Sequence, residues 1–276
     1  MLYGFLKVYV RIILRFFIRD IQVNGIENIP RDRAVMFASF HPNSFLDAIL
    51  LDCLVERPIW SLARGDAFKR AWVRDLLHKL YMMPIYRISE GKENLDKNDE
   101  TFEKCASVFR KKGQVLIFSE GLCINQTGLL PLKKGTARLA LQTWNEGIDM
   151  VVIPTALNYN QFTRIGKKIV LNFSPAIRKE DLDNHEVSGA NVVRFNQRLK
   201  EKLEKAVTRN FAFRSWRPAL YYLAFLFNFP LYLLLGTVVR SKTKGTVFFD
   251  SVYLAALVFA LPFYWLLVFA ALMFFF

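Results

Sequence analysis

One histidine and one aspartate stand in an otherwise apolar or small-residue segment, FASFHPNSFLDAILL, which covers residues 37–51. His41 and Asp47 are six positions apart, so on a continuous helix they would lie about 240° apart and could not meet. They can meet if His41 follows the end of a strand and Asp47 lies in the first turn of the next helix. Pro42 favours this arrangement, because proline disfavours a helical conformation at the preceding residue.

An imidazole held by a carboxylate is suited to proton transfer. Asp47 would accept a hydrogen bond from one ring nitrogen of His41 and leave the other nitrogen free to take a proton. The alternative is structural: Ser44 and Asp47 have the spacing of an approximate capping box, and His41 would be a hydrogen-bonded core histidine. These residues alone leave both interpretations open.

A second group of polar residues follows another apolar strand, in VLIFSEGLCINQTGLLPLKKGTARLAL (residues 115–141). Glu120 and Gly121 come directly after that strand, and ligands bind beyond the carboxyl ends of strands in open α/β sheets. Lys133 and Lys134 precede the next helix, where ammonium groups and a helix N-terminus favour phosphate. The alternative for the two lysines is an ordinary solvated surface.

The elements that must position these residues alternate between strand and helix patterns. This alternation predicts an α/β fold with a mostly parallel central sheet flanked by helices. We expect strands within residues 21–30, 34–40, 60–68, 82–88, 114–121, 150–159 and 167–177, and helices within residues 43–55, 69–80, 101–112, 135–144 and 191–207.

The N-terminal segment carries a basic residue at every fourth position, at Lys7, Arg11, Arg15 and Arg19. On a helix this spacing makes one basic stripe on an apolar cylinder. We expect residues 1–20 to form an interfacial amphipathic helix whose stripe faces phosphate headgroups. The alternative is an amphipathic helix that packs on the α/β domain, which we place at residues 21–215.

Two uncharged runs, residues 218–239 and 251–276, are each longer than the ~20 residues that cross a bilayer. Pro230 and Pro262 interrupt them, and the positive loop between them should stay on the same side as the basic domain. We therefore expect residues 216–276 to form a membrane-embedded hairpin of two kinked or re-entrant segments. Two core helices of a soluble protein are the alternative.

The composition narrows the class of partner. The chain has 38 Lys and Arg against 24 Asp and Glu, a net charge of +14, so an anionic partner is expected. A content of 26 Phe favours an anionic lipid surface over nucleic acid. The three cysteines have no paired spacing, and no metal site is expected from them or from His78 and His185.

Taken together, the motifs resemble those of the membrane glycerolipid acyltransferases of the lysophosphatidate and glycerol-3-phosphate type. That family's His-x4-Asp motif is similar to HPNSFLD here, with one residue more between His and Asp. Ser119 replaces the proline of the family's Phe-Pro-Glu-Gly motif. The other similar segments are LARGD, MPIYR, PLKKG and VVIPTALNY, in the family's order across residues 21–178.

The resemblance implies an O-acyltransferase that moves a fatty acyl chain from acyl-CoA or acyl-carrier protein to a hydroxyl of lysophosphatidate, with no other cofactor. It implies that His41 is the general base and that Asp47 orients it. Glu120 and Gly121 would hold the acceptor glycerol. Its phosphate would be neutralised by basic residues, namely Arg87, Lys133, Lys134 and Arg64.

Other functions remain open at this point. The acceptor could instead be glycerol-3-phosphate, dihydroxyacetone phosphate or a lyso-aminolipid, and a non-catalytic lipid-binding protein is a further alternative. The expected partners are a bilayer with anionic headgroups, the acyl thioester and the phosphorylated acceptor. The expected location is the cytoplasmic face of the inner or plasma membrane, or the endoplasmic reticulum in a eukaryote.

Overall fold

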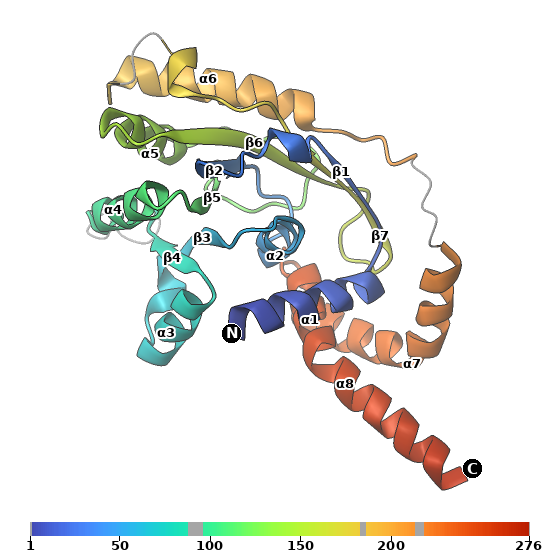
Figure 1. Cartoon of the computed structure of the whole chain (residues 1–276). Helices are drawn as coiled ribbons and strands as arrows, with labels where there is room; N and C mark the ends of the chain where they lie inside the picture. Colours follow the sequence, from blue (N-terminus) through green and yellow to red (C-terminus); the bar gives the residue numbers. More distant parts are fainter. Residues whose placement is uncertain (1, 88–95, 183–185, 213–217, 276) are drawn as a thin grey trace.

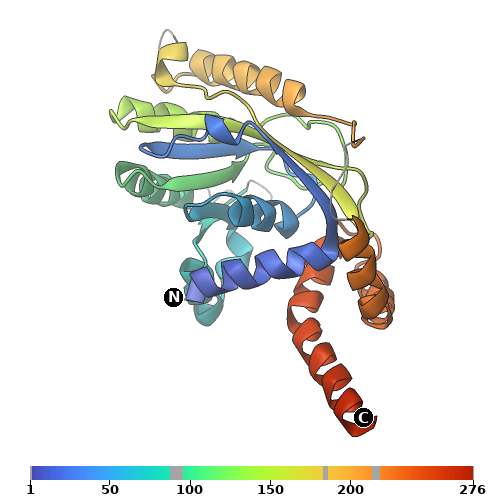
Figure 2. The same ribbon diagram turned by 45° about the vertical axis from the view of Figure 1, so that its right-hand side comes forward.

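The computed structural model describes residues 2–87, 96–182, 186–212 and 218–275. It confirms the α/β class: these residues form one seven-stranded sheet with helices on both faces (Figures 1 and 2). The strands are β1 (Ile18–Asn24), β2 (Ala34–Ser39), β3 (Ile59–Arg64), β4 (Met82–Ile85), β5 (Gln114–Phe118), β6 (Met150–Tyr159) and β7 (Lys167–Phe173). The helices are α1 (Leu2–Phe17), α2 (Phe45–Leu54), α3 (Ala71–Lys79), α4 (Lys97–Arg110), α5 (Lys134–Asn145), α6 (Gly189–Ala206), α7 (Pro218–Lys242) and α8 (Phe249–Phe275).

The sheet is mostly parallel, as expected. Its order is β1-β7-β6-β2-β5-β3-β4, and only the β6–β7 pair is antiparallel. The central strands β2 and β6 are buried along their whole length, which explains why their sequences are apolar without alternation.

Each face of the sheet has its own core. Val35 and Phe37 of β2 pack with residues of α1, α2, α7 and α8, whereas Met36 of the same strand faces residues of α4, α5 and α6. Because side chains alternate across a strand, neighbouring residues of β2 belong to opposite cores. The first face therefore joins the sheet to the N-terminal helix and the C-terminal helices.

Helix α1 packs against the domain and ends at Phe17, where the chain passes directly into β1 and pairs with β7. The ammonium of Lys7 donates to the carbonyls of Val55 and Glu56, and Arg11 donates to the carbonyl of Cys53, at the end of α2. The expectation that the whole basic stripe lies on this helix and faces headgroups is therefore wrong for Lys7 and Arg11, which bind the end of α2, and for Arg19, which lies in β1. Unsatisfied carbonyls at a helix C-terminus attract cations, and the end of α2 binds two of the four basic residues in this way.

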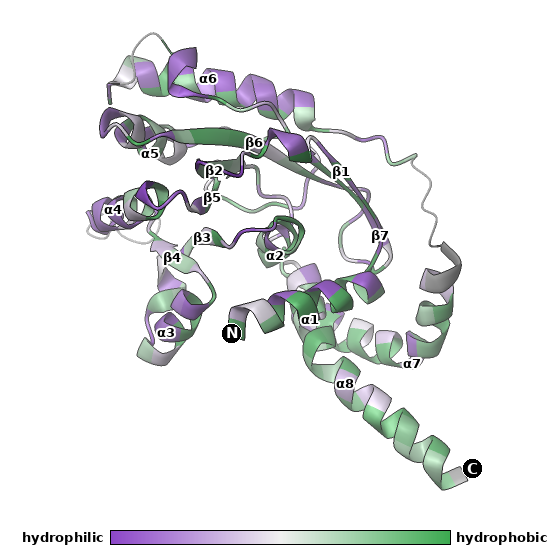
Figure 3. Ribbon diagram, in the orientation of Figure 1, coloured by the Kyte–Doolittle hydropathy of each residue, from purple (hydrophilic) through white to green (hydrophobic). Residues whose placement is uncertain are grey.

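Helices α7 and α8 continue through Pro230 and Pro262. Two described stretches, Tyr221–Lys242 and Phe249–Phe274, are long and apolar enough to cross a membrane. They are not core helices of a soluble domain, since large apolar side chains such as Leu226 (67% exposed) and Leu267 (71% exposed) face outward. Figure 3 shows both helices as predominantly hydrophobic, in contrast to α6 on the far side of the sheet.

The two C-terminal helices differ in how they lie. Helix α7 bends in Figure 1, which we attribute to Pro230, and it packs beside α1 and α8 along one face. The hydroxyl of Tyr232 in α7 donates to the carbonyl of Phe16 in α1. Helix α8 begins against the domain and then projects away from it, so large apolar side chains such as Phe263, Leu267 and Phe274 are exposed. The expected boundary between residues 215 and 216 lies outside the described residues.

Candidate active site

The sheet brings the expected site residues to one edge. β6, β2, β5, β3 and β4 are parallel neighbours, so their carboxyl ends meet there. His41 follows β2, Glu120 follows β5, Arg64 ends β3, Arg87 follows β4 and Tyr159 ends β6. This edge is where ligands bind in open α/β sheets.

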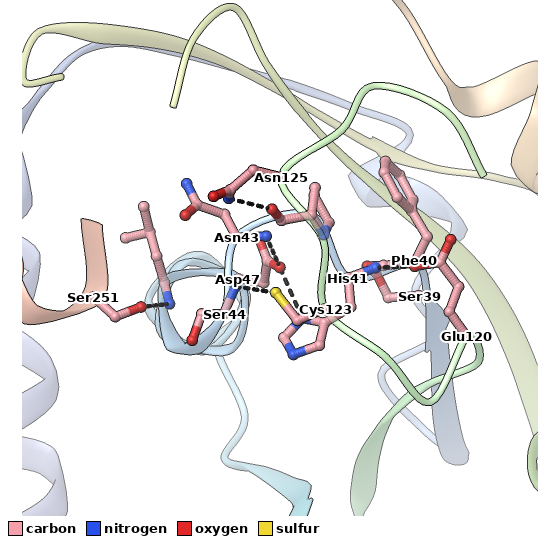
Figure 4. Close-up of polar contacts among 12 residues, drawn as sticks. Ser39, Phe40, His41, Asn43, Ser44, Asp47, Glu120, Cys123, Asn125 and Ser251 are labelled. Carbon is pink, nitrogen blue, oxygen red and sulfur yellow. Dashed lines mark hydrogen bonds and ion pairs between the residues drawn. The ribbon is translucent and has the colours of Figure 1, made fainter. Parts of the chain in front are cut away.

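His41 and Asp47 form a hydrogen-bonded dyad. The Nδ1 atom of His41 lies 2.9 Å from Oδ2 of Asp47, as Figure 4 shows. His41 lies just beyond β2 and Asp47 lies in the first turn of α2, which is the arrangement predicted from Pro42. Because an ionised carboxylate only accepts hydrogen bonds, the proton of a neutral ring belongs on Nδ1 and Nε2 is left as the base.

Asp47 is fully buried, and its carboxylate is satisfied by three donors. Besides His41, the backbone N–H of Asn43 donates to Oδ2 at 2.7 Å, and the hydroxyl of Tyr159 donates to Oδ1 at 2.6 Å. Burial and the nearby Asp47 charge raise the pKa of Tyr159 well above its ordinary value, so its hydroxyl stays protonated as a donor. The Ser44 side chain does not cap α2, so the predicted alternative of a Ser44–Asp47 capping box does not form.

Two further contacts position His41, one through its ring and one through its backbone. Its ring stacks on Phe118 at the end of β5, with ring centroids 3.7 Å apart. Its backbone N–H donates to Oε2 of Glu120 at 2.8 Å. The side chain remains 14% exposed, and no hydrogen-bond partner of Nε2 is recorded among the residues that the structure describes. This nitrogen is thus available to a substrate.

Glu120 holds backbone groups together at the site. Its Oε2 atom accepts from the N–H of His41, and its Oε1 atom accepts from the N–H of Leu130. The side chain is only 2% exposed, and burial raises the pKa of its carboxyl. These contacts show that Glu120 holds the turn after β2 and the loop after β5 together, and its predicted role in holding the acceptor stays a prediction.

The turn between His41 and α2 is held by contacts from the loop after β5. The N–H of Ser44 lies 3.0 Å from the sulfur of Cys123, and the amide of Asn125 donates to the carbonyl of Pro42. Ser44 has a φ of +52°, which is rare for a non-glycine residue. Backbone strain of this kind is common at functional sites.

The predicted basic residues lie around this edge. Lys133 and Lys134 are exposed at the start of α5, and the aliphatic part of Lys133 packs over Gly121, where a Cβ atom would approach Cγ to 3.1 Å. Gly121 itself has a φ of +62°, which favours glycine. Arg87 is close enough to lower the pKa of the Cys123 thiol slightly, against the burial that raises it to about 12. Arg64 is half-exposed and pairs with Asp66.

A last contribution to the site comes from α8, which the sequence did not suggest. Asp250 accepts a hydrogen bond from the side chain of Asn43. Ser251 accepts one from the N–H of Leu46 (Figure 4). The sequence also did not suggest Tyr159 as a partner of Asp47. Its position at the end of a fully buried strand was the available signal, because a buried tyrosine hydroxyl usually has a partner.

Comparison with known proteins identifies this arrangement. A family model described as Acyltransferase matches residues 20–158, which is just over half of the 276-residue chain. The chain belongs to the acyltransferase family. The matched region of this acyltransferase contains His41, Asp47, Glu120 and the two lysines after it. No curated protein matches the chain.

The fold of this acyltransferase is also found in a solved structure. It is similar to the crystal structure of the 1-acyl-sn-glycerophosphate (LPA) acyltransferase, PlsC, from Thermotoga maritima, with a TM-score of 0.55 and 18% sequence identity. The similarity covers 76% of this chain and 81% of that chain. Within the ranges that the structure describes, no three His, Cys, Asp or Glu side chains gather as metal ligands, and independence from a metal or cofactor stays a prediction.

Proposed function

We propose that this acyltransferase moves a fatty acyl chain from an acyl thioester, acyl-CoA or acyl-carrier protein, to the free hydroxyl of lysophosphatidate, giving phosphatidate. The observation that carries the proposal is the 2.9 Å contact between His41 and Asp47 at the ligand-binding edge of the sheet. An acceptor with an acyl chain is supported by the apolar helix α8, whose first turn contacts the turn between His41 and Asp47.

His41 acts as the general base in this mechanism. As the acceptor hydroxyl oxygen attacks the thioester carbonyl carbon, Nε2 of His41 takes the hydroxyl proton. The buried carboxylate of Asp47 stabilises the resulting imidazolium and keeps the ring in place. The tetrahedral intermediate then collapses, the carbon–sulfur bond breaks, and the imidazolium returns its proton to the departing thiolate. No covalent acyl-enzyme is needed.

The phosphate of the acceptor is neutralised by basic residues of the same edge. The candidates are Arg87, which follows β4, Arg64, which ends β3, and Lys133 and Lys134 at the start of α5. An arginine can bind a phosphate through two parallel hydrogen bonds, while lysines act as point charges. Glycerol-3-phosphate and dihydroxyacetone phosphate offer the same phosphate, so they are the competing acceptors.

We also propose how the enzyme sits on a membrane. In Figures 1 and 2, which share a vertical axis, α3 lies at about the height of α1 on the side toward which α8 projects. Trp72 (65% exposed) and Leu76 (41% exposed) share one face of α3, flanked by exposed basic residues. Such a face inserts into the interface of an anionic leaflet. On this arrangement α7 lies along the leaflet and α8 enters the hydrocarbon.

The test is acyl transfer by the purified full-length protein in lipid nanodiscs. Labelled acyl-CoA and acyl-carrier protein are each offered with lysophosphatidate, glycerol-3-phosphate, dihydroxyacetone phosphate and a lyso-aminolipid. We expect turnover to be fastest with lysophosphatidate. We expect His41→Ala to lower kcat by about 10²–10⁴-fold, with the thermal midpoint little changed. Asp47→Asn should also lose most activity, because it disturbs the ring orientation.

Two results would contradict the proposal. Retained turnover in a folded His41→Ala protein would exclude the general-base mechanism. Lack of transfer to every acceptor by the wild-type protein, with lipid binding intact, would favour a non-catalytic lipid-binding protein instead.

A further inference from the structure

A chain of buried polar contacts joins the first turn of α8 to the catalytic dyad. The backbone N–H of Asn43 donates to Oδ2 of Asp47, and the side-chain amide of Asn43 donates to Oδ2 of Asp250 at 2.6 Å. The other carboxylate oxygen of Asp250 lies 2.6 Å from the ammonium of Lys167 in β7. Every member of this chain is at most 1% exposed.

The ion pair between Lys167 and Asp250 is costly to bury. Two charges lose their hydration there, and removing either one would leave the other uncompensated. Burial lowers the pKa of Lys167, while the Asp250 carboxylate opposes that shift. The ammonium also lies 4.6 Å from the ring centroid of Phe17, which adds a cation–π contact. A hydrophobic helix could be attached to the domain by apolar packing alone, so this pair needs another explanation.

The position of Asp250 in the sequence also indicates that it does more than attach α8 to the domain. It is the single acidic residue in the last 70 residues of the chain, residues 207–276. It lies in the first turn of α8, where the helix dipole stabilises a carboxylate. The Oδ1 atom of Asn43 is buried without a hydrogen-bond partner among the described residues. The bond to Asp250 is therefore what fixes the amide of Asn43.

We propose that Asp250, held by Lys167, is a positioning residue of the active site: it anchors the side chain of Asn43 and thereby holds the backbone N–H that orients Asp47 and His41. On this view α8 completes the catalytic site as well as contacting lipid. The inference rests on the proposed function, because it assigns a role relative to the His41–Asp47 dyad.

The decisive experiment measures kcat and the acceptor KM of full-length variants in nanodiscs, with thermal midpoints recorded for each. Asp250→Ala removes the acceptor for Asn43, and Asn43→Ala removes the donor. The double variant Asp250→Asn with Lys167→Met removes both charges but keeps an oxygen that can accept from Asn43. The matched control is Asn191→Ala, which removes a buried amide that donates to the carbonyl of Glu186 at the start of α6.

We expect Asp250→Ala and Asn43→Ala each to lower kcat about 10–100-fold, with the acceptor KM changed less than about threefold, because a small misplacement of a catalytic group has that effect. Their combination should be no slower than either single variant. The charge-free Asp250→Asn, Lys167→Met protein should recover kcat to within about fivefold of wild type. Asn191→Ala should lower only the thermal midpoint.

A purely structural role predicts a different pattern. If folded Asn43→Ala protein keeps the wild-type kcat, or if the losses of Asn43→Ala and Asp250→Ala multiply when combined, the inference is overturned. Should Asp250→Ala not fold, the kcat values of Asn43→Ala and of the charge-free variant decide. A wild-type enzyme that is active and silenced by His41→Ala, together with unaffected Asn43→Ala, rejects this inference alone; inactivity of the wild type rejects the proposed function.

Discussion

At the scale of single residues, the site depends on a carboxylate with no contact to solvent. Asp47 is 0% exposed and accepts hydrogen bonds from His41, Asn43 and Tyr159. A buried carboxylate loses its hydration, and these three donors replace the hydrogen bonds to water. A charged Asp47 is in turn what the imidazolium of His41 requires during proton transfer.

Removing the Tyr159 hydroxyl tests this dependence. We expect Tyr159→Phe to lower the free energy of unfolding by about 1–3 kcal/mol, because a buried charged acceptor loses a donor. We expect kcat to fall about tenfold, since the unpaired Oδ1 allows the carboxylate to reorient away from His41. Because the pKa of Tyr159 is raised, its hydroxyl is a donor throughout and the ratio of the two rates should stay constant from about pH 6 to 9.

The measurements are denaturant or thermal unfolding and steady-state kinetics in the same detergent. Tyr232→Phe is the control, because its hydroxyl donates to the carbonyl of Phe16 away from the dyad. An equal loss of kcat in both variants would show that the effect is general destabilisation.

The dyad itself was predictable, because a strand end, Pro42 and the first turn of a helix restrict where His41 and Asp47 can lie. The partners that complete it were not. Tyr159 is 112 residues from Asp47, and Asp250 is 207 residues from Asn43. Only the strand order and the docking of α8 bring them together, and neither is encoded in local spacing. The place of Glu120 at a strand end was predictable, but in a sequence a carboxylate that binds a ligand looks the same as one that accepts backbone N–H groups.

At the scale of elements, the N-terminal helix supports the helix that carries Asp47. Lys7 and Arg11 satisfy carbonyls at the end of α2, the helix whose first turn carries Asp47. The regular spacing of the basic residues predicted the helix correctly as far as Arg15, whereas Arg19, expected on the same helix, lies in β1. It could not divide the stripe into residues that face the protein and residues that face outward, because that division depends on where α2 ends.

Substitutions along the stripe should therefore have separate effects. We expect Lys7→Met with Arg11→Met to lower the thermal midpoint by about 2–8 °C, through the loss of hydrogen bonds at the end of α2. Arg15→Met, at an exposed position, should leave the midpoint nearly unchanged and reduce binding to anionic vesicles. Thermal unfolding and vesicle flotation distinguish the two; a larger loss of vesicle binding in the Lys7, Arg11 variant than in Arg15→Met would contradict the assignment.

At the scale of the whole molecule, the two faces of the sheet have different surroundings. The α4, α5 and α6 side is covered by helices with polar outer surfaces, while α1, α7 and α8 cover the other side and expose large apolar side chains (Figure 3). The α/β class and the two apolar helices were predictable from periodicity and run length. The bend of α7 was expected from Pro230, whereas its close packing on α1 required the tertiary structure.

The proposed leaflet contact of α3 can be measured with brominated phospholipids, which quench tryptophans near the acyl chains. We expect Trp72→Phe to reduce the fraction of fluorescence that is quenched, because Trp72 is 65% exposed and would meet the leaflet in the proposed arrangement. Trp144→Phe is the control, since Trp144 is 2% exposed in the opposite core and should contribute unquenched emission. Unchanged quenching in Trp72→Phe would place α3 away from the leaflet.

The ion pair between Lys167 and Asp250 has a consequence for how the chain assembles. Before α8 docks, the ammonium of Lys167 has no counter-ion at a position that the docked helix will bury. The carboxylate of Asp250 likewise has no counter-ion among the apolar residues of α8. Each charge is unfavourable without the other, so α8 should dock in the one register that pairs Asp250 with Lys167. If Asp250 positions Asn43 as proposed, the enzyme becomes competent for acyl transfer only after α8 has docked on the domain.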